Sequence, residues 1–462
     1  MKNMTLDKLA KAVGGTLVCD ASMRTREIMG VVLDSRKVEK DFLFVATVGA
    51  RVDGHSFIAQ VAKEGALAVL CERVPEVEIP YILVDNSFRA LRAAAAYYRR
   101  QLGVKVVGIT GSVGKTSTKE VIANVLSRKF RVCKTQGNFN NEVGVPLTIF
   151  SIRETDEIAV LELGINHFGE MHRLGEMAMP DVCVFTNIGQ CHLEFLGSRD
   201  GILKAKTELL EHMNQDAVVV LNGDDDKLCT ITDVQGKRPV FYGTGEQNTY
   251  RAVDIVPEGV FGSRATIVTS GGRFETFMPL PGEHMVWNAV AATAVGEYFG
   301  MTTEEIDAGI RSVQSVGGRS NLIRAKKYTV IDDCYNANPN SMKAAISLLK
   351  MADSRKVAVL GDMFELGENE SSLHAEVGVF AVQSTIDVLI CVGTLSRAMY
   401  EAAENEAGKQ KAGAGPKLYY FETKEELLFH RAELFQTGDT ILIKASHGME
   451  FSKLVTELSG EE

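Results

Sequence analysis

The sequence predicts an α/β protein of three domains, which we place at residues 1–102, 103–317 and 318–462. Its 462 residues exceed what one hydrophobic core usually organises. Short apolar runs alternate with helical patterns, which is typical of mostly parallel sheets covered by helices. A glycine-rich loop that carries a lysine and a threonine stands between a predicted strand and a predicted helix at residues 108–118.

Composition and charge narrow the class of protein. Apolar residues make up 45% of the chain and charged residues 24%, which are values of globular proteins. The formal charge of −10 argues against broad nucleic-acid binding, although a local basic pocket can still hold an anionic ligand. The first residues contain no apolar signal core, and no apolar run is long enough to cross a membrane. We therefore expect a soluble cytoplasmic protein without a membrane span.

The first domain reads as a small α/β unit. Apolar runs at residues 42–46, 66–70 and 81–84 predict strands. Residues 53–65 lead into a helix, and residues 87–100 have apolar side chains at helical spacing, with Ser87 as the expected cap.

The second domain has a stronger alternation of strands and helices. Strands are predicted at residues 104–109, 158–163, 182–186 and 217–221, which together indicate a mostly parallel central sheet. Residues 241–278 read as β-rich, and a helix follows at residues 286–299. The pair Gly317-Gly318 marks the expected boundary.

The third domain resembles a doubly wound, Rossmann-like fold. Its predicted strands lie at residues 329–332, 356–360, 388–392 and 441–443, again with helical patterns between them.

The glycine-rich loop predicts a cradle for the phosphates of a nucleotide. Backbone N–H groups and the helix N-terminus favour phosphate, Lys115 can reach its oxygens, and Thr116 can hold Mg²⁺. The usual pattern has a glycine where this chain has Ile109, so the loop is a shortened variant; a chance Gly-Lys-Thr turn is the alternative. The residues predicted to bind ATP here are Thr110, Gly111, Ser112, Val113, Gly114, Lys115, Thr116 and Ser117.

Polar residues follow two other predicted strands. Glu162 lies at the end of one predicted strand and His192 falls just past the end of another, where open α/β sheets bind their ligands, so both are candidate Mg²⁺ ligands. A surface glutamate and a satisfied polar histidine are the alternatives. Lys204 and Lys206 share the next predicted helix, and two such lysines usually form a solvated face.

Two asparagine clusters are also candidates for binding. Residues 138–146 and 332–339 place several amides in turns, and amides can recognise a sugar, an amide or a phosphate. Such clusters are also ordinary turn formers. Arg319, next to the boundary glycines, can bring a cation to a phosphate or can be a surface residue.

Taken together, these motifs resemble the Mur ligases of peptidoglycan synthesis. In chain order they are the loop at 110–117, Gly-Asn-Phe-Asn-Asn-Glu-Val-Gly-Val-Pro at 137–146, Glu-Leu-Gly at 162–164, Asn-Ile-Gly-Gln-Cys-His at 187–192, and Asp-Asp-Cys-Tyr-Asn-Ala-Asn-Pro at 332–339. The resemblance covers nearly the whole chain, including the Asp-Ser-Arg loop at 34–36. The phosphate loop alone would not separate the chain from folylpolyglutamate synthase, a relative of the family.

The resemblance implies roles for particular residues. Lys115 and Thr116 would bind the ATP phosphates and Mg²⁺, Glu162 and His192 would ligate a second Mg²⁺, and Lys206 would be a carbamate that holds metal. This last implication replaces the solvated-face interpretation of Lys206. The implied catalytic set is Lys115, Glu162, His192 and Lys206. Asn288 would contact the adenine, and Arg319 and Asp333 would reach ATP from the third domain after closure. The implied substrate contacts are Asp34, Ser35, Arg36, Asn138, Asn140, Asn141, Tyr335, Asn336 and Asn338.

The implied activity is ATP-dependent amide-bond formation through an acyl phosphate, which would serve cell-wall biogenesis and thereby cell shape and division. The motifs fit the dipeptide-adding branch, whose substrates are UDP-N-acetylmuramoyl-tripeptide and D-alanyl-D-alanine, and we expect a monomer. The Asp-Asn-Pro-Arg motif of the preceding ligase is absent. Alternatives are another Mur or folylpolyglutamate-type ligase and a non-catalytic nucleotide-binding homologue. A guanine-type switch is disfavoured because the chain has no Asn-Lys-x-Asp motif.

Two positions depart from the family pattern. The chain has His284-Met285 where the family often has His-Asn, and Lys-Ala-Ser-His-Gly-Met at 444–449 where the family favours an arginine in place of His447. A histidine can bind an anion there more weakly and depending on pH, and His447 is a candidate to accept the proton of the attacking amine.

Overall fold

The computed structural model describes residues 1, 3–49, 52–189, 191, 193–314, 321–364, 366–410 and 415–460. Its residues divide into two compact units. The first consists of Met1–Val253, Thr266–Phe274 and Trp287–Ile310, and the second of Asp254–Ala265, Glu275–Val286 and Arg311–Glu462. The three-domain boundaries expected from the sequence stay a prediction.

The N-terminal part of the first unit contains a five-stranded sheet in the order β1-β5-β4-β3-β2. Its strands are Thr16–Val18 (β1), Gly30–Val32 (β2), Phe42–Val45 (β3), Ala68–Cys71 (β4) and Tyr81–Leu83 (β5). All neighbours pair in parallel except β1 and β5, which pair antiparallel. The helices are Leu6–Val13 (α1), Ile58–Lys63 (α2) and Ser87–Gln101 (α3).

The residue that caps helix α3 stands one position before the residue that the sequence predicted. The side chain that caps it belongs to Asn86, whose Oδ1 accepts from the N–H of Arg89 at 2.8 Å, so the expected Ser87 cap is wrong. Asparagine and serine are about equally good caps, and local pattern does not separate two neighbours of this kind. Further along α3, the Tyr98 hydroxyl donates to the carbonyl of Ile152 at 2.8 Å and ties the helix to the following region.

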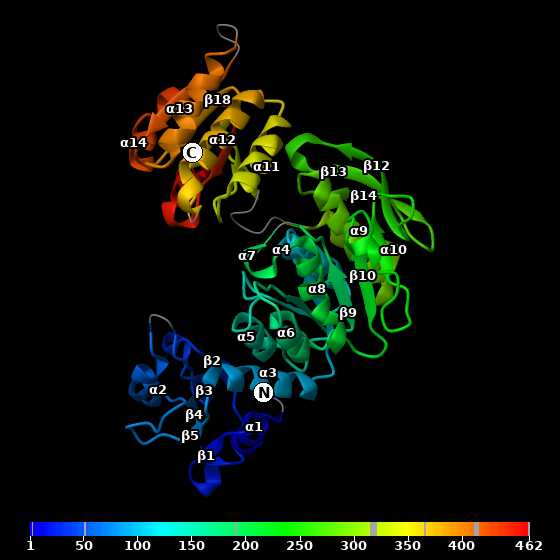
Figure 1. The fold of residues 1–462 in the computed structure, drawn as a ribbon, viewed down its shortest axis with the longest axis vertical. Helices are drawn as coiled ribbons and strands as arrows, with labels where there is room; N and C mark the ends of the chain where they lie inside the picture. The colour runs from blue at the N-terminus through cyan, green and yellow to red at the C-terminus, as the bar shows by residue number, and fades with distance from the viewer. Residues whose placement is uncertain are drawn as a thin grey trace. The chain divides into compact units, whose positions relative to one another are not determined.

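The central sheet has nine strands in the order β14-β13-β12-β11-β10-β9-β6-β8-β7. Figure 1 labels β9, β10, β12, β13 and β14 of this sheet. Its strands are Lys105–Thr110 (β6), Val132–Lys134 (β7), Ile158–Glu162 (β8), Val182–Phe185 (β9), Val218–Asn222 (β10), Val240–Gly243 (β11), Tyr250–Pro257 (β12), Ser263–Val268 (β13) and Arg273–Met278 (β14). The strands from β7 to β12 pair in parallel. Strand β6 lies between β8 and β9. The chain adds β7 and β8 on one side of β6 and then crosses to add β9 and β10 on the other side. Open α/β sheets bind ligands at such a switch point.

Along the chain, helices lie between the strands of the central sheet from β6 to β10 and follow its last strand, β14. They are Lys115–Leu126 (α4), Gly144–Ser151 (α5), Glu170–Ala178 (α6), Leu193–Leu196 (α7), Arg199–Thr207 (α8), Glu283–Tyr298 (α9) and Thr303–Arg311 (α10). Strands β6, β8 and β9 are buried over nearly their whole length. Burial on both faces is the expected state of a parallel sheet covered by helices.

The C-terminal sheet has six strands in the order β15-β16-β20-β17-β18-β19. They are Asn321–Arg324 (β15), Thr329–Asp332 (β16), Lys356–Gly361 (β17), Val388–Val392 (β18), Lys417–Phe421 (β19) and Thr440–Lys444 (β20). Only the β15–β16 pair is antiparallel. The helices are Pro339–Lys350 (α11), Glu370–Gln383 (α12), Ser396–Ala407 (α13), Lys424–Phe429 (α14), Arg431–Leu434 (α15) and Ser452–Ser459 (α16).

Short 3₁₀ turns complete the elements. They are Ala21–Met23 (η1), Ser35–Lys37 (η2), Gly54–Phe57 (η3), Glu208–His212 (η4), Leu228–Thr230 (η5), Gly259–Phe261 (η6), Gly367–Asn369 (η7) and His447–Met449 (η8). The predicted α/β class, with mostly parallel sheets, is confirmed. Within the described residues, every helix is too short or too polar to cross a bilayer.

Candidate functional site

The phosphate loop joins β6 to α4 and depends on two glycines. Gly111 and Gly114 have φ values of 149° and 84°, a region that other residues rarely adopt. A Cβ added to Gly111 would also collide with the hydroxyl of Thr186. The loop can therefore bring its backbone close to a ligand only with glycine at these positions.

The segment that follows β9 fixes the shape of this loop. The Val113 N–H donates to Asn187 Oδ1 at 2.9 Å, and the Thr186 hydroxyl donates to the carbonyl of Val113 at 2.6 Å. The Gly189 N–H donates to Ser112 Oγ at 2.9 Å. The Asn-Ile-Gly motif after β9 thus holds the loop from the neighbouring strand, which pre-organises it for a ligand.

Two lysines meet at the carbonyl of Gly111. Lys115 Nζ donates to this oxygen at 2.9 Å, and Lys206 Nζ, from α8, donates to it at 3.0 Å. Lys206 is only 1% exposed, whereas Lys204 on the same helix is exposed. Burial, together with the charge of Lys115, lowers the pKa of Lys206 to about 8. Lys206 is therefore part of the site, and the solvated-face interpretation is wrong for it.

Glu162 lies at the end of β8 and is 2% exposed. Its Oε1 accepts from the Thr116 hydroxyl at 3.1 Å and from Asn140 Nδ2 at 2.8 Å. Its Oε2 finds no hydrogen-bond partner among the described residues. A buried carboxylate oxygen with spare capacity beside a threonine hydroxyl fits Mg²⁺, which prefers oxygen ligands. The residues present thus suit a magnesium ion next to the phosphate loop.

Lys119, which was not among the predicted site residues, lies close to Glu162. Its ammonium group is fully buried, donates to the carbonyl of Thr135 at 2.8 Å and lies 3.8 Å from Glu162 Oε2. It also pairs with Glu120 at 2.9 Å. Lys119 follows Lys115 by four residues on α4, a spacing that places both on one helix face and that was available as a signal. It gives the buried carboxylate an opposite charge.

A polar cavity of about 360 Å³ opens beside Lys115. Its lining brings together the phosphate loop, the first asparagine cluster and the segment after β8. The lining residues are Lys115, Asn140, Asn141, Glu142, Val143, Gly164, Ile165, Asn166 and Glu170. The first three of these residues were predicted site residues, whereas Glu142 lies in the quoted 137–146 motif without being given a role, and Asn166 and Glu170 belong to none of the quoted motifs.

The asparagines of the first cluster do different things. Asn140 contacts Glu162, whereas Asn141 Oδ1 accepts from the N–H groups of Val143 and Gly144 at 3.1 and 2.9 Å. Asn138 is exposed in the same turn. The turn-forming interpretation is confirmed for Asn141, whereas ligand binding by this cluster stays a prediction.

Asn288 lies on α9 and is buried. Its Oδ1 accepts from the Thr118 hydroxyl at 2.8 Å, and Thr118 belongs to α4, the helix that begins at the phosphate loop. The residue is thus tied to the helix whose N-terminus forms the cradle.

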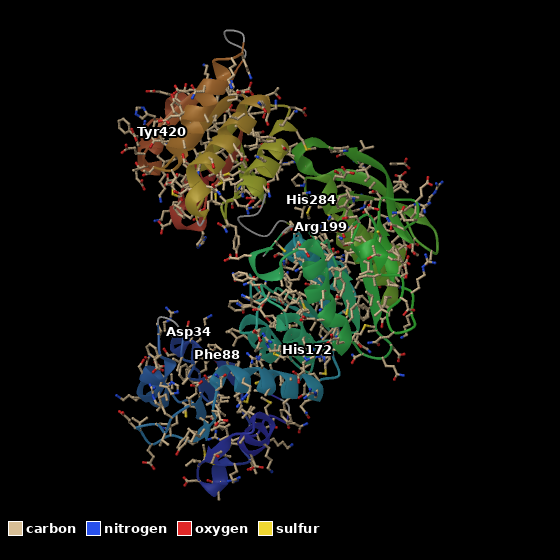
Figure 2. All side chains as sticks on the ribbon, in the orientation of Figure 1. Asp34, Phe88, His172, Arg199, His284 and Tyr420 are labelled. Atoms are coloured by element: carbon tan, nitrogen blue, oxygen red, sulfur yellow. The ribbon has the colours of Figure 1, made fainter. Side chains whose placement is uncertain are left out.

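The Asp-Ser-Arg loop of the N-terminal sheet forms η2. The Asp34 carboxylate accepts hydrogen bonds from Arg36 Nε at 2.9 Å and from Arg36 Nη2 at 2.8 Å. Ser35, the residue between them in the chain, is buried. The Arg36 guanidinium lowers the pKa of Asp34 to about 2. Asp34 is labelled in Figure 2, and Arg36 remains largely exposed.

In the second unit, the motif after β16 gathers around a buried lysine. Lys444 Nζ lies 2.6 Å from Asp333 Oδ2 and donates to the carbonyl of Asn336 at 2.8 Å. Asn338 caps α11 through a reciprocal bond pair with Ser341. The Tyr335 ring is 37% exposed, and its centroid lies 6.4 Å from that of His447. His192 and Arg319 lie outside the described residues, so their roles stay predictions.

Comparisons with known proteins agree along the chain. Residues 27–115 match the model of the Mur ligase family, catalytic domain; residues 109–296 match the Mur ligase middle domain; and residues 318–447 match the Mur ligase, glutamate ligase domain. The UDP-N-acetylmuramoyl-tripeptide–D-alanyl-D-alanine ligase of Bacillus subtilis is 39% identical over 464 residues, with 99% of each chain covered. The enzyme of that name from Escherichia coli is 33% identical with the same coverage.

Solved structures give the same result. A structure of MurF from Acinetobacter baumannii superimposes with a TM-score of 0.90 at 32% identity, covering 99% of each chain. MurF ligase from Thermotoga maritima, solved in complex with ADP, gives 0.78 at 30% identity, covering 94% of this chain and 97% of that one. Folylpolyglutamate synthase from Mycobacterium tuberculosis gives 0.61 at 17% identity and covers 81% of this chain and 95% of that one, a likeness of fold alone.

Proposed function

The chain belongs to the Mur ligase family, and we propose that it joins D-alanyl-D-alanine to UDP-N-acetylmuramoyl-tripeptide with ATP in peptidoglycan synthesis. The observation that carries this proposal is the meeting of Lys115, Lys206 and the Thr116–Glu162 pair around the phosphate loop. A cationic lysine, a second lysine that can become a metal-binding carbamate, and a buried carboxylate beside a threonine hydroxyl suit phosphoryl transfer from ATP at a phosphate cradle.

Three parts of the chain divide the work in this proposal. Residues 1–102 bind the UDP-sugar through Asp34, Ser35 and Arg36. Residues 103–317 bind ATP at the phosphate loop, with Asn288 toward the adenine. Residues 318–462 close over both substrates and contribute Arg319 and Asp333 to ATP binding. We also propose that the protein works as a monomer in the cytoplasm, where ATP is available.

The first step activates the tripeptide. Its terminal carboxylate attacks the γ-phosphorus of ATP, and the bond between this phosphorus and the oxygen that bridges to the β-phosphate breaks. The products of this step are ADP and the acyl phosphate of the tripeptide. Lys115 and the N–H groups of the loop stabilise the negative charge that gathers on the transferred group. Asn138, Asn140 and Asn141 position the tripeptide, which is supported by the presence of Asn140 and Asn141 in the cavity beside Lys115.

Magnesium is the expected helper of this step. Thr116 and Glu162 would hold one ion, and Glu162, His192 and carbamylated Lys206 would hold a second. When bound, these ions offset negative charge on the phosphates. The spare oxygen of Glu162 supports the first part of this assignment.

Lys206 is suited to become a carbamate. Its neutral amine would form an N–C bond with CO₂ and release one proton, which turns a cation into a metal-binding anion. At a pKa of about 8, about a tenth of the amine is neutral at pH 7, far more than for an ordinary lysine. The burial of the group supports the same assignment, because the anion would face Lys115 rather than water.

The second step forms the amide bond. The free amine of D-alanyl-D-alanine attacks the acyl carbon, phosphate departs, and a base takes the proton of the amine. Tyr335, Asn336 and Asn338 are the proposed dipeptide contacts, and His447, near Tyr335, is our candidate for the base. Closure of the third part would shield the acyl phosphate from water.

A phosphate-release assay tests the assignment. The protein is incubated with Mg-ATP, the UDP-linked tripeptide and D-alanyl-D-alanine, and each component is omitted in turn. Parallel reactions use lysine and diaminopimelate as the third residue, and single amino acids in place of the dipeptide. We expect release only with all three substrates. Release that ignores the dipeptide, or that prefers a single amino acid, would overturn the proposal in favour of another ligase of the family.

A further inference from the structure

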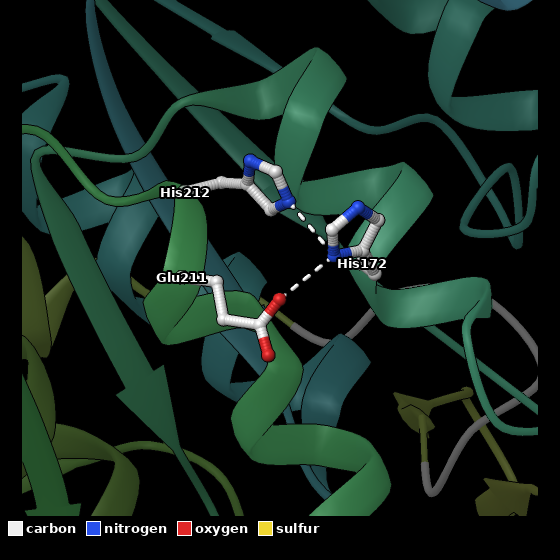
Figure 3. A group of neighbouring side chains, drawn as sticks. All are labelled: His172, Glu211 and His212. Atoms are coloured by element: carbon white, nitrogen blue, oxygen red, sulfur yellow. Dashed lines mark hydrogen bonds and ion pairs between the residues drawn. The ribbon is translucent and has the colours of Figure 1, made fainter.

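Two histidines and a glutamate converge on the surface of the first unit, away from the phosphate loop in sequence (Figure 3). His172 lies on α6, and Glu211 and His212 lie on η4. His172 Nδ1 is 2.7 Å from Glu211 Oε2 and 3.1 Å from His212 Nε2. The described function uses none of these three side chains.

The protons at this point do not satisfy all three atoms. If His172 Nδ1 carries a proton, it can donate well to only one of its two neighbours. If His212 Nε2 carries the proton instead, then Glu211 Oε2 faces an imidazole nitrogen that has only a lone pair. The three atoms, His172 Nδ1, Glu211 Oε2 and His212 Nε2, each have a lone pair to donate, but they share only one proton. A metal cation bound among them would accept a lone pair from all three.

From this arrangement we propose that His172, Glu211 and His212 form a binding site for a divalent transition metal of the zinc class. Two imidazoles and one carboxylate are a ligand set that Zn²⁺, Co²⁺ and Ni²⁺ accept, while Mg²⁺ and Ca²⁺ prefer oxygen ligands alone. Water would complete the coordination because His172 and Glu211 are half-exposed. This site is independent of the proposed ligase activity.

The distances allow the site with small movements. Ligands about 2.0–2.1 Å from a tetrahedral zinc lie roughly 3.3 Å from one another. The two separations from His172 Nδ1, 2.7 and 3.1 Å, are somewhat shorter, and all three ligand atoms lie within 4.8 Å of one another, so modest side-chain rotations would bring them to these distances. The neighbouring carboxylates of Glu176 and Glu208 add negative charge, which favours a cation.

The backbones that carry the ligands are already fixed. Glu208, on η4, accepts from the N–H groups of Gly169 at 3.0 Å and His172 at 3.2 Å, so it joins the start of α6 to η4. The His212 ring packs over Gly175, where a Cβ would lie 3.1 Å from its Cδ2. A metal ion would strengthen this link between α6, which begins at the cavity residue Glu170, and η4, which follows the helix of Lys206.

Metal titration of the full-length protein tests the site. Zn²⁺ and Co²⁺ are added separately in excess Mg²⁺, which keeps the magnesium positions filled. The parent protein is compared with the double variant His172→Gln/His212→Gln and with the control variant His430→Gln. His430 is an exposed histidine that pairs with one glutamate, Glu433, three residues later. We expect the parent and His430→Gln to bind one equivalent of Zn²⁺ more than the double variant, and to give a visible Co²⁺ absorption that the double variant lacks.

Thermal unfolding supplies a second readout. Zn²⁺ should raise the unfolding midpoint of the parent by a few degrees and leave that of the double variant unchanged, since a ligand stabilises only a protein that binds it. Glu211→Gln keeps both imidazoles, so its affinity for Zn²⁺ should lie between the two. Circular dichroism without metal shows whether the variants fold. Equal metal binding and equal thermal shifts in the parent and a folded double variant would overturn the proposal.

Discussion

Lys206 shows how burial changes the meaning of a residue. Replacing it by alanine removes the side chain proposed to hold metal, so we expect phosphate release to fall by about 10²-fold or more. Formate or acetate should partly restore activity by supplying a carboxylate at the vacated place. Lys204→Ala is the matched control, because Lys204 is exposed on the same helix and should keep the parent's activity. The measurement is phosphate release with all substrates.

The outcomes of this comparison separate two explanations. If Lys206→Ala loses activity and no small acid restores it, the lysine acts as a cation beside Lys115. If it keeps activity, Lys206 has no catalytic role. Thermal unfolding of both variants shows whether either loss comes from misfolding.

The pKa of Lys206 predicts how the carbamate depends on pH. Because the folded-state pKa is lowered to about 8, the neutral amine increases about tenfold per pH unit below pH 8 and levels off above it. Protein depleted of CO₂ should therefore regain activity faster as pH rises from 6 to 8 at constant dissolved CO₂. Recovery is followed by phosphate release under one standard assay condition. A recovery rate that keeps rising tenfold per unit beyond pH 9 would indicate an ordinary lysine.

Glu162 provides a test of the magnesium site. Glu162→Gln keeps the size of the side chain and removes its charge, so the variant should need more Mg²⁺ and lose about 10²-fold in turnover. Glu157→Gln, just before the same strand, changes an exposed ion pair with Arg131 and should behave like the parent. Activity is measured against Mg²⁺ concentration. Equal Mg²⁺ dependence of the parent and Glu162→Gln would remove Glu162 from the metal site.

The limits of sequence reasoning are visible at these residues. Glu162 could be singled out because it ends an apolar strand, and its burial excludes the alternative of a surface glutamate, while its role as a metal ligand stays a prediction. Lys204 and Lys206 look alike in sequence, and only the packing of α8 against the phosphate loop separates them. Composition and spacing contain no information about that packing, and the family resemblance alone singled out Lys206.

At the scale of elements, long apolar runs predicted the buried strands β6, β8, β9, β17, β18 and β20 within one or two residues. Prediction failed for short strands at or near sheet edges, such as β1, β7 and β19, where half-exposed residues give no clear apolar run. Whether such a segment forms a strand depends on the strand beside it, and the local sequence pattern carries no information about that neighbour.

The turn before α5 offers a test of how an element positions the site. Gly144 begins this helix, and a Cβ there would collide with the backbone of Phe139 in the Asn138–Asn141 turn. Gly144→Ala should displace the turn, cost about 1–3 kcal/mol of unfolding free energy and raise KM for the UDP-tripeptide. Gly103→Ala meets no atom within 4 Å among the described residues and serves as the control.

Urea unfolding and steady-state kinetics measure the two effects of Gly144→Ala. An alanine normally favours a helix over glycine, so an unchanged or increased stability would show that the turn gives way without cost. An unchanged KM together with lower stability would separate the turn's structural role from substrate binding.

At the scale of the whole molecule, the chain divides into two compact units, while its proposed ATP contacts come from both. The phosphate loop, Glu162 and Lys206 belong to the first unit, and Asp333 belongs to the second, whereas Arg319 lies outside the described residues. If ATP and the UDP-tripeptide both favour closure of the third part, each should increase affinity for the other. Such coupling is reciprocal and usually amounts to about 5–150-fold in affinity.

This coupling can be measured without catalysis. We expect the UDP-tripeptide to tighten binding of a non-hydrolysable ATP analogue in the parent protein. Arg319→Ala should bind the analogue alone nearly as well as the parent, because the loop at Lys115 is intact, but it should lose most of the tightening. Arg397→Ala removes an exposed arginine of the same unit and should retain it. Equal tightening in the parent and Arg319→Ala would mean that Arg319 does not carry the coupling, so that Asp333 would be the remaining proposed ATP contact of the second unit.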